Sequence, residues 1–202
     1  DFPDYDDRVF RSADGGLTWT DLGEIIPEGI IDFVVVDAET LVAADQQGNI
    51  YHSDDSGLTW LQTFSSPGPQ VGYLSSSVPV FADSQTGYFA FGNGFVVKTI
   101  DGGLSWNQIS SGSGNTLNDV VRFDNGSLLA VGENGTILRN SGSALWLLGE
   151  QISPEHLRAV QLIDQNNLAM VAETGQVYLS NNSGNTWTAV PGLPAGLFSA
   201  ED

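Results

Sequence analysis

The chain has 202 residues, of which 41% are hydrophobic, enough to bury the core of one domain. Its 6 Lys+Arg against 25 Asp+Glu residues give a formal net charge of -19, which repels phosphate backbones and argues against nucleic-acid binding. The sequence has no cysteine, so disulfides and thiolate metal sites are excluded, and no stretch approaches the ~20 apolar residues of a membrane-spanning helix.

From the N-terminus onward the chain is a series of similar units. Residues 1–23 predict two short strands, at 8–12 and 18–22, and further units cover 30–64, 71–110, 117–151 and 157–190. Each unit contains a motif ending in tryptophan: SADGGLTW (12–19), SDDSGLTW (53–60), TIDGGLSW (99–106), the worn copy RNSGSALW (139–146) and SNNSGNTW (180–187). The tryptophans are 41, 46, 40 and 41 residues apart, so the motif is more typical of repeat architecture than of an active site.

The fourth unit shows best what one repeat contains. It predicts four short strands, LNDVVRF (117–123), SLLAVGE (127–133), GTILRN (135–140) and ALWLLGE (144–150), separated by glycine-containing turns. Val, Ile, Thr, Tyr and Trp are frequent throughout, which disfavours helical repeats. Four strands in a period of ~40 residues indicate an all-β propeller of four-stranded antiparallel blades.

The predicted third strands support this fold, because a blade between two neighbours is buried on both faces. Successive side chains of a strand point to opposite faces of the sheet. Two adjacent positions of the third strand are apolar in every unit. They hold Val9 and Phe10, Ile50 and Tyr51, Val96 and Val97, Ile137 and Leu138, and Val177 and Tyr178. The next position holds Arg11, His52, Lys98, Arg139 and Leu179. We expect this mostly basic ladder to join neighbouring blades, through a carboxylate of the adjacent blade, rather than to bind a ligand.

The tryptophan motif spans the predicted turn between the third and fourth strands. A short aspartate there can accept hydrogen bonds from turn N–H groups, glycine supplies positive φ, and the indole can pack back over the turn. Asparagine can take the acceptor role in the last copy. The residues predicted to form these structural turns are Ser12, Asp14, Gly16, Trp19, Ser53, Asp55, Gly57, Trp60, Asp101, Gly103, Trp106, Asn182, Gly184 and Trp187.

The two ends of the chain leave the number of blades open. Residues 196–202, GLFSAED, resemble an innermost strand, and joining them to the N-terminal strands would complete a fifth blade of a single 1–202 propeller domain. The chain starts at Asp1 without an initiator methionine or a signal-peptide pattern, which is expected either of a processed mature form or of an excerpt from a longer protein. The alternative to a closed five-bladed ring is an excerpt from a larger propeller.

The motif resembles the Asp-box, or bacterial neuraminidase repeat, Ser-x-Asp-x-Gly-x-Thr-Trp, which 12–19 and 53–60 match at every position. Among proteins with such boxes, the photosystem II assembly and stability factors are similar in LNDVVRF…LLAVGENGTILRNSG (117–142) and GFVVKTIDGGLSW (94–106). The resemblance implies a non-enzymatic, extracytoplasmic scaffold, in the periplasm, thylakoid lumen or secreted, that holds membrane-protein subunits during assembly. The chain departs from that family in having about five repeats rather than seven, and few arginines for a basic partner-binding patch.

Sequence evidence for catalysis is thin, because a sialidase-like site needs an arginine cluster and only Arg122 and Arg158 lie on predicted innermost strands. His52 and His156 are 104 residues apart and cysteine is absent, so we expect no metal and no cofactor. Two alternatives stay open: a secreted carbohydrate-binding or glycoside-hydrolase propeller with a glycan ligand, and a structural module of a surface or filament assembly.

Propellers usually bind partners on the rim where innermost strands begin and second strands turn into third strands. The residues expected on that rim are Asp45, Gln46, Glu133, Asn134, Glu173, Thr174, Asn118, His156 and Arg158. The insertion 65–79 is expected to project from the same side, and longer loops on a rigid scaffold often carry function. The residues predicted to bind a protein partner are Arg122, Arg158, His156, Asn118, Glu133, Glu173 and Tyr73.

Overall fold

The computed structural model of the protein describes residues 8–24, 26, 29–45, 47–66, 79–90, 94–110, 112–140, 147–148 and 154–191. Within these residues the chain forms one two-stranded and four four-stranded antiparallel sheets, each a simple meander in which sequence neighbours pair. We number the sheets as blades 1 to 5 in chain order. The predicted all-β propeller architecture is confirmed.

Short turns connect most of the strands within each blade, as the glycine-containing turns of the sequence predict. Blade 1 holds β1 (Arg8–Arg11) and β2 (Thr20–Glu24), and blade 2 holds β3 (Ile30–Val35), β4 (Leu41–Asp45), β5 (Ile50–Ser53) and β6 (Leu61–Phe64). Blade 3 holds β7 (Val80–Phe81), β8 (Gly87–Ala90), β9 (Phe95–Thr99) and β10 (Asn107–Ser110).

The last two blades continue the same order. Blade 4 holds β11 (Leu117–Arg122), β12 (Leu128–Gly132), β13 (Ile137–Asn140) and β14 (Leu147–Leu148), with a 3-10 turn η2 (Glu133–Gly135) between β12 and β13. Blade 5 holds β15 (Leu157–Leu162), β16 (Leu168–Ala172), β17 (Val177–Ser180) and β18 (Thr188–Ala189).

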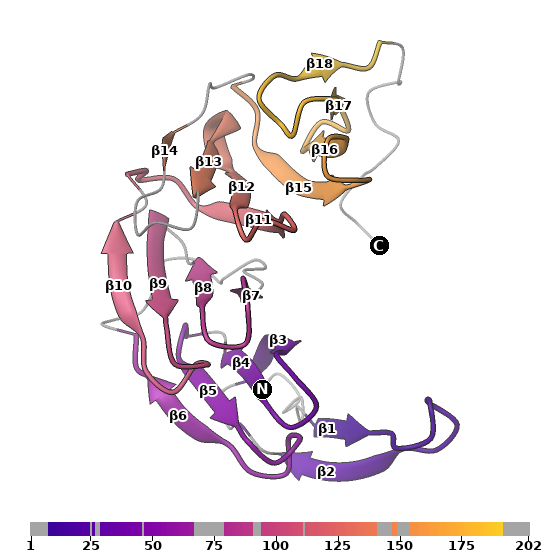
Figure 1. Cartoon of the computed structure of the whole chain (residues 1–202), viewed down its shortest axis with the longest axis vertical. Coiled ribbons are helices and arrows are strands. Elements are labelled where there is room, and N and C mark those ends of the chain that lie inside the picture. Colours follow the sequence, from indigo (N-terminus) through magenta and orange to yellow (C-terminus); the bar gives the residue numbers. More distant parts are fainter. Residues whose placement is uncertain are drawn as a thin grey trace, which may run out of the picture.

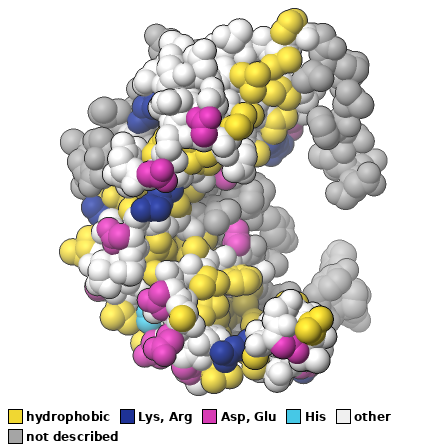
Figure 2. Space-filling model, turned by 45° about the vertical axis from the view of Figure 1, so that its right-hand side comes forward, with side chains coloured by type: hydrophobic (Ala, Val, Ile, Leu, Met, Phe, Trp, Pro, Cys, Tyr) yellow, Lys and Arg dark blue, Asp and Glu magenta, His cyan; other side chains and the backbone are white. Residues whose placement is uncertain are grey.

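The blades stand side by side along an arc (Figure 1). In blades 2 to 5 the first strand lies at the concave edge and the fourth strand at the convex edge. Blade 1 is at one end of the described arc and blade 5 at the other (Figures 1 and 2). The predicted closing strand, 196–202, and the loop part containing Tyr73 lie outside the described residues, so closure of a five-bladed ring stays a prediction. The predicted rim residue Gln46 also lies outside the described residues.

Short polar side chains and glycines set the turns of each blade. Asp37, Asp83 and Asp164 each use Oδ1 to accept two backbone N–H groups in the turn between the first and second strands, at 2.6–3.0 Å. Gly48 and Gly175 turn the second strand into the third with φ of +83°, a conformation that glycine adopts without steric cost.

Hydrophobic side chains fill the space between neighbouring blades rather than one central core. Blades 2 and 3 share a cluster that includes Val42, Ile50, Phe89 and Val97. Blades 3 and 4 share Tyr88, Val96, Leu128 and Leu138, and blades 4 and 5 share Leu129, Ile137, Leu157, Leu168 and Met170. Each interior blade therefore contributes to two clusters, one on each face, and burial of apolar area between blades holds the arc together.

The end blades differ from the interior ones at the same repeat positions. Ile50, Val96 and Ile137 on one face of the third strand, and Val97 and Leu138 on the other, are buried as predicted. The prediction of burial is wrong at Phe10, which is 53% exposed. Phe10 belongs to blade 1, which has a neighbouring described sheet on one side only, so the other side of this repeat position meets solvent.

Candidate functional site

The tryptophan motif is a closed loop of hydrogen bonds that the third and fourth strands share. In blade 2, Ser53 Oγ accepts the Gly57 N–H at 2.9 Å, and Asp55 accepts Thr59 N–H at 2.8 Å and Thr59 Oγ1–H at 2.6 Å. The indole Nε1 of Trp60 donates to the Gly57 carbonyl at 3.0 Å. Residues 12–19 and 99–106 repeat this set of bonds, with Thr99 and Ser105 taking the serine and threonine roles in the third copy.

The last copy replaces the aspartate by asparagine and reverses one bond. Asn182 Oδ1 accepts the Thr186 N–H at 2.9 Å, as aspartate does elsewhere, but Asn182 Nδ2 donates to Thr186 Oγ1 at 2.8 Å. Trp187 Nε1 is buried and has no hydrogen-bond partner within the described part of the chain. This copy therefore keeps the shape of the turn with weaker, uncharged bonds.

Hydrogen bonding lowers the pKa of the box aspartates below the ordinary value for aspartate. The bonds from Thr18 side chain and backbone lower the pKa of Asp14 to about 2, and those from Thr59 lower the pKa of Asp55 to about 2. At Asp101 burial acts to raise the pKa, but bonds from Ser105 and Thr99 outweigh it and the net shift is downward. The turn itself supplies hydrogen bonds to the oxygens of these three aspartates, as the structural role predicted for the boxes requires.

One residue of the basic ladder, Arg139, joins two blades, but not through the carboxylate that the sequence predicts. Arg139 Nη1 in blade 4 donates to the backbone carbonyl of Ser183, in the box of blade 5, at 3.0 Å. Lys98 Nζ lies 5.3 Å from the ring centroid of Tyr88 in its own blade. The expectation of a carboxylate partner for Arg139 is wrong, since a backbone carbonyl takes that place.

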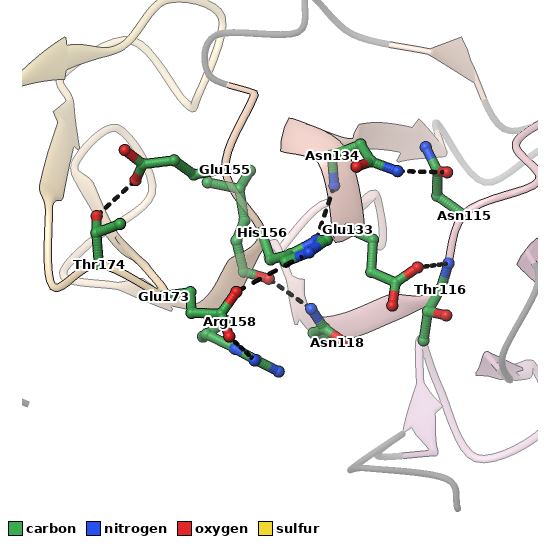
Figure 3. A network of polar contacts seen from close by, with 11 residues as sticks. Asn115, Thr116, Asn118, Glu133, Asn134, Glu155, His156, Arg158, Glu173 and Thr174 are labelled. Carbon is green, nitrogen blue, oxygen red and sulfur yellow. Dashed lines mark hydrogen bonds and ion pairs between the residues drawn. The ribbon is translucent and has the colours of Figure 1, made fainter. Parts of the chain in front are cut away.

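The predicted binding rim is a polar network between blades 4 and 5 (Figure 3). The N–H of Glu133 donates to the carbonyl of Thr116 at 2.9 Å, and the N–H of Glu173 donates to the carbonyl of His156 at 2.8 Å. These bonds occupy the same position in two successive repeats and tie each turn after a second strand to the start of its own innermost strand. They hold both glutamates at the rim.

Side chains then connect the two blades across the rim. Asn134 N–H in η2 donates to Nδ1 of His156 at 3.2 Å, which places the proton of the neutral imidazole on Nε2. That Nε2 is 3.9 Å from Glu173 Oε2, and Arg158 Nη2 pairs with Glu173 Oε1 at 2.6 Å (Figure 3). The side chains of His156, Arg158 and Glu173 are 41–48% exposed, so this pre-arranged group is open to a partner.

One buried and one part-buried hydrogen bond below the rim fix the innermost strands against each other. Asn118 Nδ2 donates to the carbonyl of Leu157 at 2.7 Å, and the Val160 N–H donates to Asp119 Oδ2 at 2.8 Å. Burial raises the pKa of Asp119, while the bonds from Val160 and Val120 act to lower it. Asn118 is buried, so it positions β15 and with it Arg158, rather than facing a partner itself.

The structure separates some of the residues that the sequence grouped together. Arg122 is the last residue of β11, next to the β11–β12 turn, whereas Arg158 follows the first residue of β15. Asp124 N–H in that turn donates to Gln165 Oε1 in the β15–β16 turn at 2.8 Å, so the two strands run in register and the two arginines lie at opposite rims. The expectation that Asp45 is displayed on the rim is wrong: it is 0% exposed.

Asp45 is instead a buried turn acceptor. Its two oxygens accept bonds from Gln47, Asn49 and Tyr51, at 2.7–2.9 Å. Sequence reasoning also missed Asp119, Asn115 and Glu155 as parts of the rim and its support. A signal for Asp119 was available, since Asp32 occupies the same repeat position in blade 2, directly before Phe33, whose N–H it accepts at 2.7 Å.

Charge at the candidate site and over the surface is mostly negative. Glu133, Glu155 and Glu173 outnumber Arg158 at the rim (Figure 3), and Asp and Glu side chains are scattered over the visible face (Figure 2). Among the described residues no group of three or more His, Cys, Asp or Glu side chains is placed to hold a metal ion. The described part also contains no helix long and apolar enough to cross a membrane.

Comparison with known proteins finds similarity to a family of assembly factors. A family model described as Photosynthesis system II assembly factor YCF48 matches residues 75–200. The curated protein Photosystem II assembly lipoprotein Ycf48 of Synechococcus sp. (strain CC9902) is 29% identical over 185 residues, which are 88% of this chain and 54% of the relative. The chain thus spans about half the length of that relative.

Solved structures show the same fold. One described as YCF48 bound to D1 peptide has a TM-score of 0.67 at 18% identity, covering 90% of this chain and 61% of that chain. The GH74 xyloglucanase from Xanthomonas campestris has a TM-score of 0.62 at 15% identity, covering 83% of this chain and 31% of that chain. At these identities the two likenesses establish the propeller fold alone.

Proposed function

The chain belongs to the Photosynthesis system II assembly factor YCF48 family, and from this membership we propose that it is a non-enzymatic propeller that holds a segment of a membrane-complex subunit during assembly. The observation that carries the proposal is the family match over 75–200, which includes blades 3 to 5 and the whole described rim. The D1 peptide named in a related structure is the first partner to test.

The construction of the rim supports a binding role. Backbone bonds between each turn and its innermost strand hold Glu133 and Glu173 in place, and the Asn118 contact fixes β15 beneath them. A partner would therefore meet side chains that are already ordered, which lowers the entropic cost of binding. Arg158 and His156 offer donors, and Glu133 and Glu173 offer acceptors.

The proposed compartment is extracytoplasmic. Its support is the name of the relative from Synechococcus sp., which is called a lipoprotein. The absence of cysteine from the sequence is compatible with that setting but does not select it. Likeness to a xyloglucanase at 15% identity concerns the fold and adds no support for a glycan-cleaving function.

Peptide binding to matched variants tests the proposal. The D1 peptide is titrated against the protein by calorimetry, together with a scrambled peptide of equal charge. We expect saturable binding of the D1 peptide only, weakened about tenfold by Arg158→Gln, since a charged hydrogen bond contributes roughly 1.5–3 kcal/mol.

The control for that variant is Arg8→Gln. Arg8 forms an equally exposed ion pair with Asp21, at 2.7 Å, at the far end of the arc, so its loss should leave peptide affinity unchanged. Equal binding of the scrambled peptide, or no binding of either peptide, would contradict the proposal. An equal loss in both arginine variants would show that the rim of blades 4 and 5 is not the site.

A further inference from the structure

A second polar pocket lies at the opposite rim from the proposed binding site. It occupies about 380 Å³ where the β11–β12 turn of blade 4 meets the β15–β16 turn and the box of blade 5. Arg139, from the third strand of blade 4, is part of its wall together with Asp124, Asn125, Gln165, Asn166 and Ser183. None of these residues belongs to the Arg158–Glu173 network, so the pocket needs its own explanation.

Arg139 is a half-buried cation that has no counter-ion among the described residues. Within the part of the chain that the structure describes, its guanidinium forms one hydrogen bond, from Nη1 to the Ser183 carbonyl at 3.0 Å. Within the described residues no carboxylate lies within 4.0 Å of its guanidinium, although the chain carries 25 acidic residues. Burial lowers the pKa of Arg139, which is the direction expected when desolvation of a charge is not compensated.

The amide side chains around Arg139 accept hydrogen bonds through their oxygens, but their NH2 groups donate none to the described residues. Gln165 Oε1 accepts the Asp124 N–H at 2.8 Å, and Asn125 Oδ1 accepts the Ser127 N–H at 2.9 Å. Asn166 Oδ1 accepts from Ser183 Oγ at 3.3 Å. Each amide therefore presents an NH2 group with no partner among the described residues, which makes the wall rich in donors.

We propose that this pocket binds a carboxylate, which would accept hydrogen bonds from Arg139 and from the amide groups of Asn125, Gln165 and Asn166. A planar carboxylate has about four lone-pair sites and suits the fork of a guanidinium, so it fits a donor-rich wall with one cation. The site goes beyond the proposed function and does not depend on it, because it lies at the other rim and uses other residues.

The equivalent position between blades 2 and 3 lacks the donor-rich wall, so this wall is not a general feature of the repeat. There the ladder residue is His52 instead of an arginine, and hydrogen bonds from Glu39 and Thr40 lower the pKa of the nearby Asp37 carboxyl. Gln85 Nε2 donates to the Ser84 carbonyl at 3.2 Å, so its amide is occupied. Neither an uncompensated arginine nor a free amide donor occurs at that position.

The negative charge of Asp124 disfavours carboxylate binding in this pocket, so its removal tests the proposal through an expected gain of affinity. Its carboxylate is part of the wall and, in the described structure, is not used to cap its own turn, because Asn125 takes that role. A negative charge in the wall repels an incoming carboxylate. Asp124→Asn should therefore tighten binding, whereas removal of a merely solvated aspartate would have no effect.

The test uses nuclear magnetic resonance of the labelled full chain at constant ionic strength. Acetate is titrated into the protein, and acetamide, a neutral molecule of similar shape, is titrated in a parallel experiment. We expect saturable shifts of the side-chain amide signals of Asn125, Gln165 and Asn166 with acetate only. Two capped tripeptides, one with a glutamate side chain and one with a free terminal carboxylate, then distinguish which source of the group the pocket accepts.

Variants decide whether the effect belongs to this pocket. Gln165→Glu keeps the oxygen that accepts the Asp124 N–H but replaces the free NH2 by a negative oxygen, and should weaken acetate at least about tenfold. Arg139→Gln should do the same, while Lys98→Gln, which removes a charge at the same repeat position one blade earlier, should not. Identical responses to acetate and acetamide, or saturation that persists in both Gln165→Glu and Arg139→Gln, would overturn the proposal.

Discussion

The boxes at 12–19 and 99–106 have the same internal bonds but opposite surroundings. Trp19 and Trp106 each donate to the carbonyl of their own box glycine at 3.1 Å, and Asp14 and Asp101 each accept a hydroxyl at 2.6 Å. Yet Trp19 is 61% exposed and Trp106 is 8% exposed. The local motif thus closes without help from a neighbouring blade, and burial is added by packing.

The contacts of the box glycines show where that packing comes from. A Cβ on Gly103, in blade 3, would lie 2.7 Å from Val42 Cγ2 of blade 2, and one on Gly184, in blade 5, would lie 2.6 Å from Leu129 Cδ1 of blade 4. A Cβ on Gly16 would meet only its own Trp19, at 3.7 Å. The boxes of blades 3 and 5 therefore pack against the preceding blade, and the box of blade 1 has no described blade before it (Figure 1).

The largest expected difference between the two boxes comes from their tryptophans. Trp106→Ala removes a buried indole between blades 2 and 3 and should lower the free energy of unfolding by about 3–5 kcal/mol. Trp19→Ala removes a mostly exposed indole and should cost less than about 1 kcal/mol. Urea unfolding followed by circular dichroism measures both. Equal losses would mean that closure of the box, and not packing of the blade, determines stability.

A smaller difference is expected when the box glycines are replaced by alanine. Both Gly16 and Gly103 have positive φ, +90° and +96°, so alanine at either position is strained by roughly 1–2 kcal/mol. Gly103→Ala must also displace Val42, and should cost about 1–3 kcal/mol more. The same urea series reports the excess, and Gly103→Ala combined with Val42→Ala is the control, because a smaller neighbour should remove part of it. An unchanged cost in the double variant would contradict the steric explanation.

The repeat made most of this fold predictable from sequence. The predicted strands 117–123, 127–133 and 135–140 agree with β11, β12 and β13 to within two residues, because each unit repeats the same turn chemistry. Exposure at Phe10 was not predictable, since it depends on whether another blade lies beside blade 1. Apolar alternation describes a face that is suited to burial, not one that is buried.

The candidate site was less predictable, because it depends on contacts between repeats. Glu133 and Glu173 could be placed on the rim from their position after a second strand, and Arg158 from its place on an innermost strand. Arg122 also lies on an innermost strand, but at its end, whereas Arg158 lies near the start of its strand. The position along the strand therefore decides which rim a residue reaches. Asp45 shows that an acidic residue in a turn can accept hydrogen bonds from the backbone of that turn instead of facing solvent. Only the three-dimensional contacts reveal this.

The smallest expected effect concerns the one described box that lacks a charge. Asn182→Asp should restore an acceptor for the Thr186 hydroxyl and convert two neutral bonds into charge-assisted ones, so the urea midpoint should rise slightly at pH 7. A carboxyl whose folded-state pKa is depressed adds stability above its unfolded pKa, near 3.8, and loses it as the pH falls through the folded pKa.

With a folded-state pKa near that of Asp14, about 2, the gain from Asn182→Asp should shrink from pH 4 downward and vanish near pH 2. Asp14→Asn is the mirror control in the exposed box, and should lower the midpoint at pH 7 while leaving it unchanged at pH 2. A gain that is independent of pH would mean that shape, not charge, limits the last box. The hydrogen bonds of the motif would then be interchangeable between aspartate and asparagine, and the difference between the boxes would reduce to packing alone.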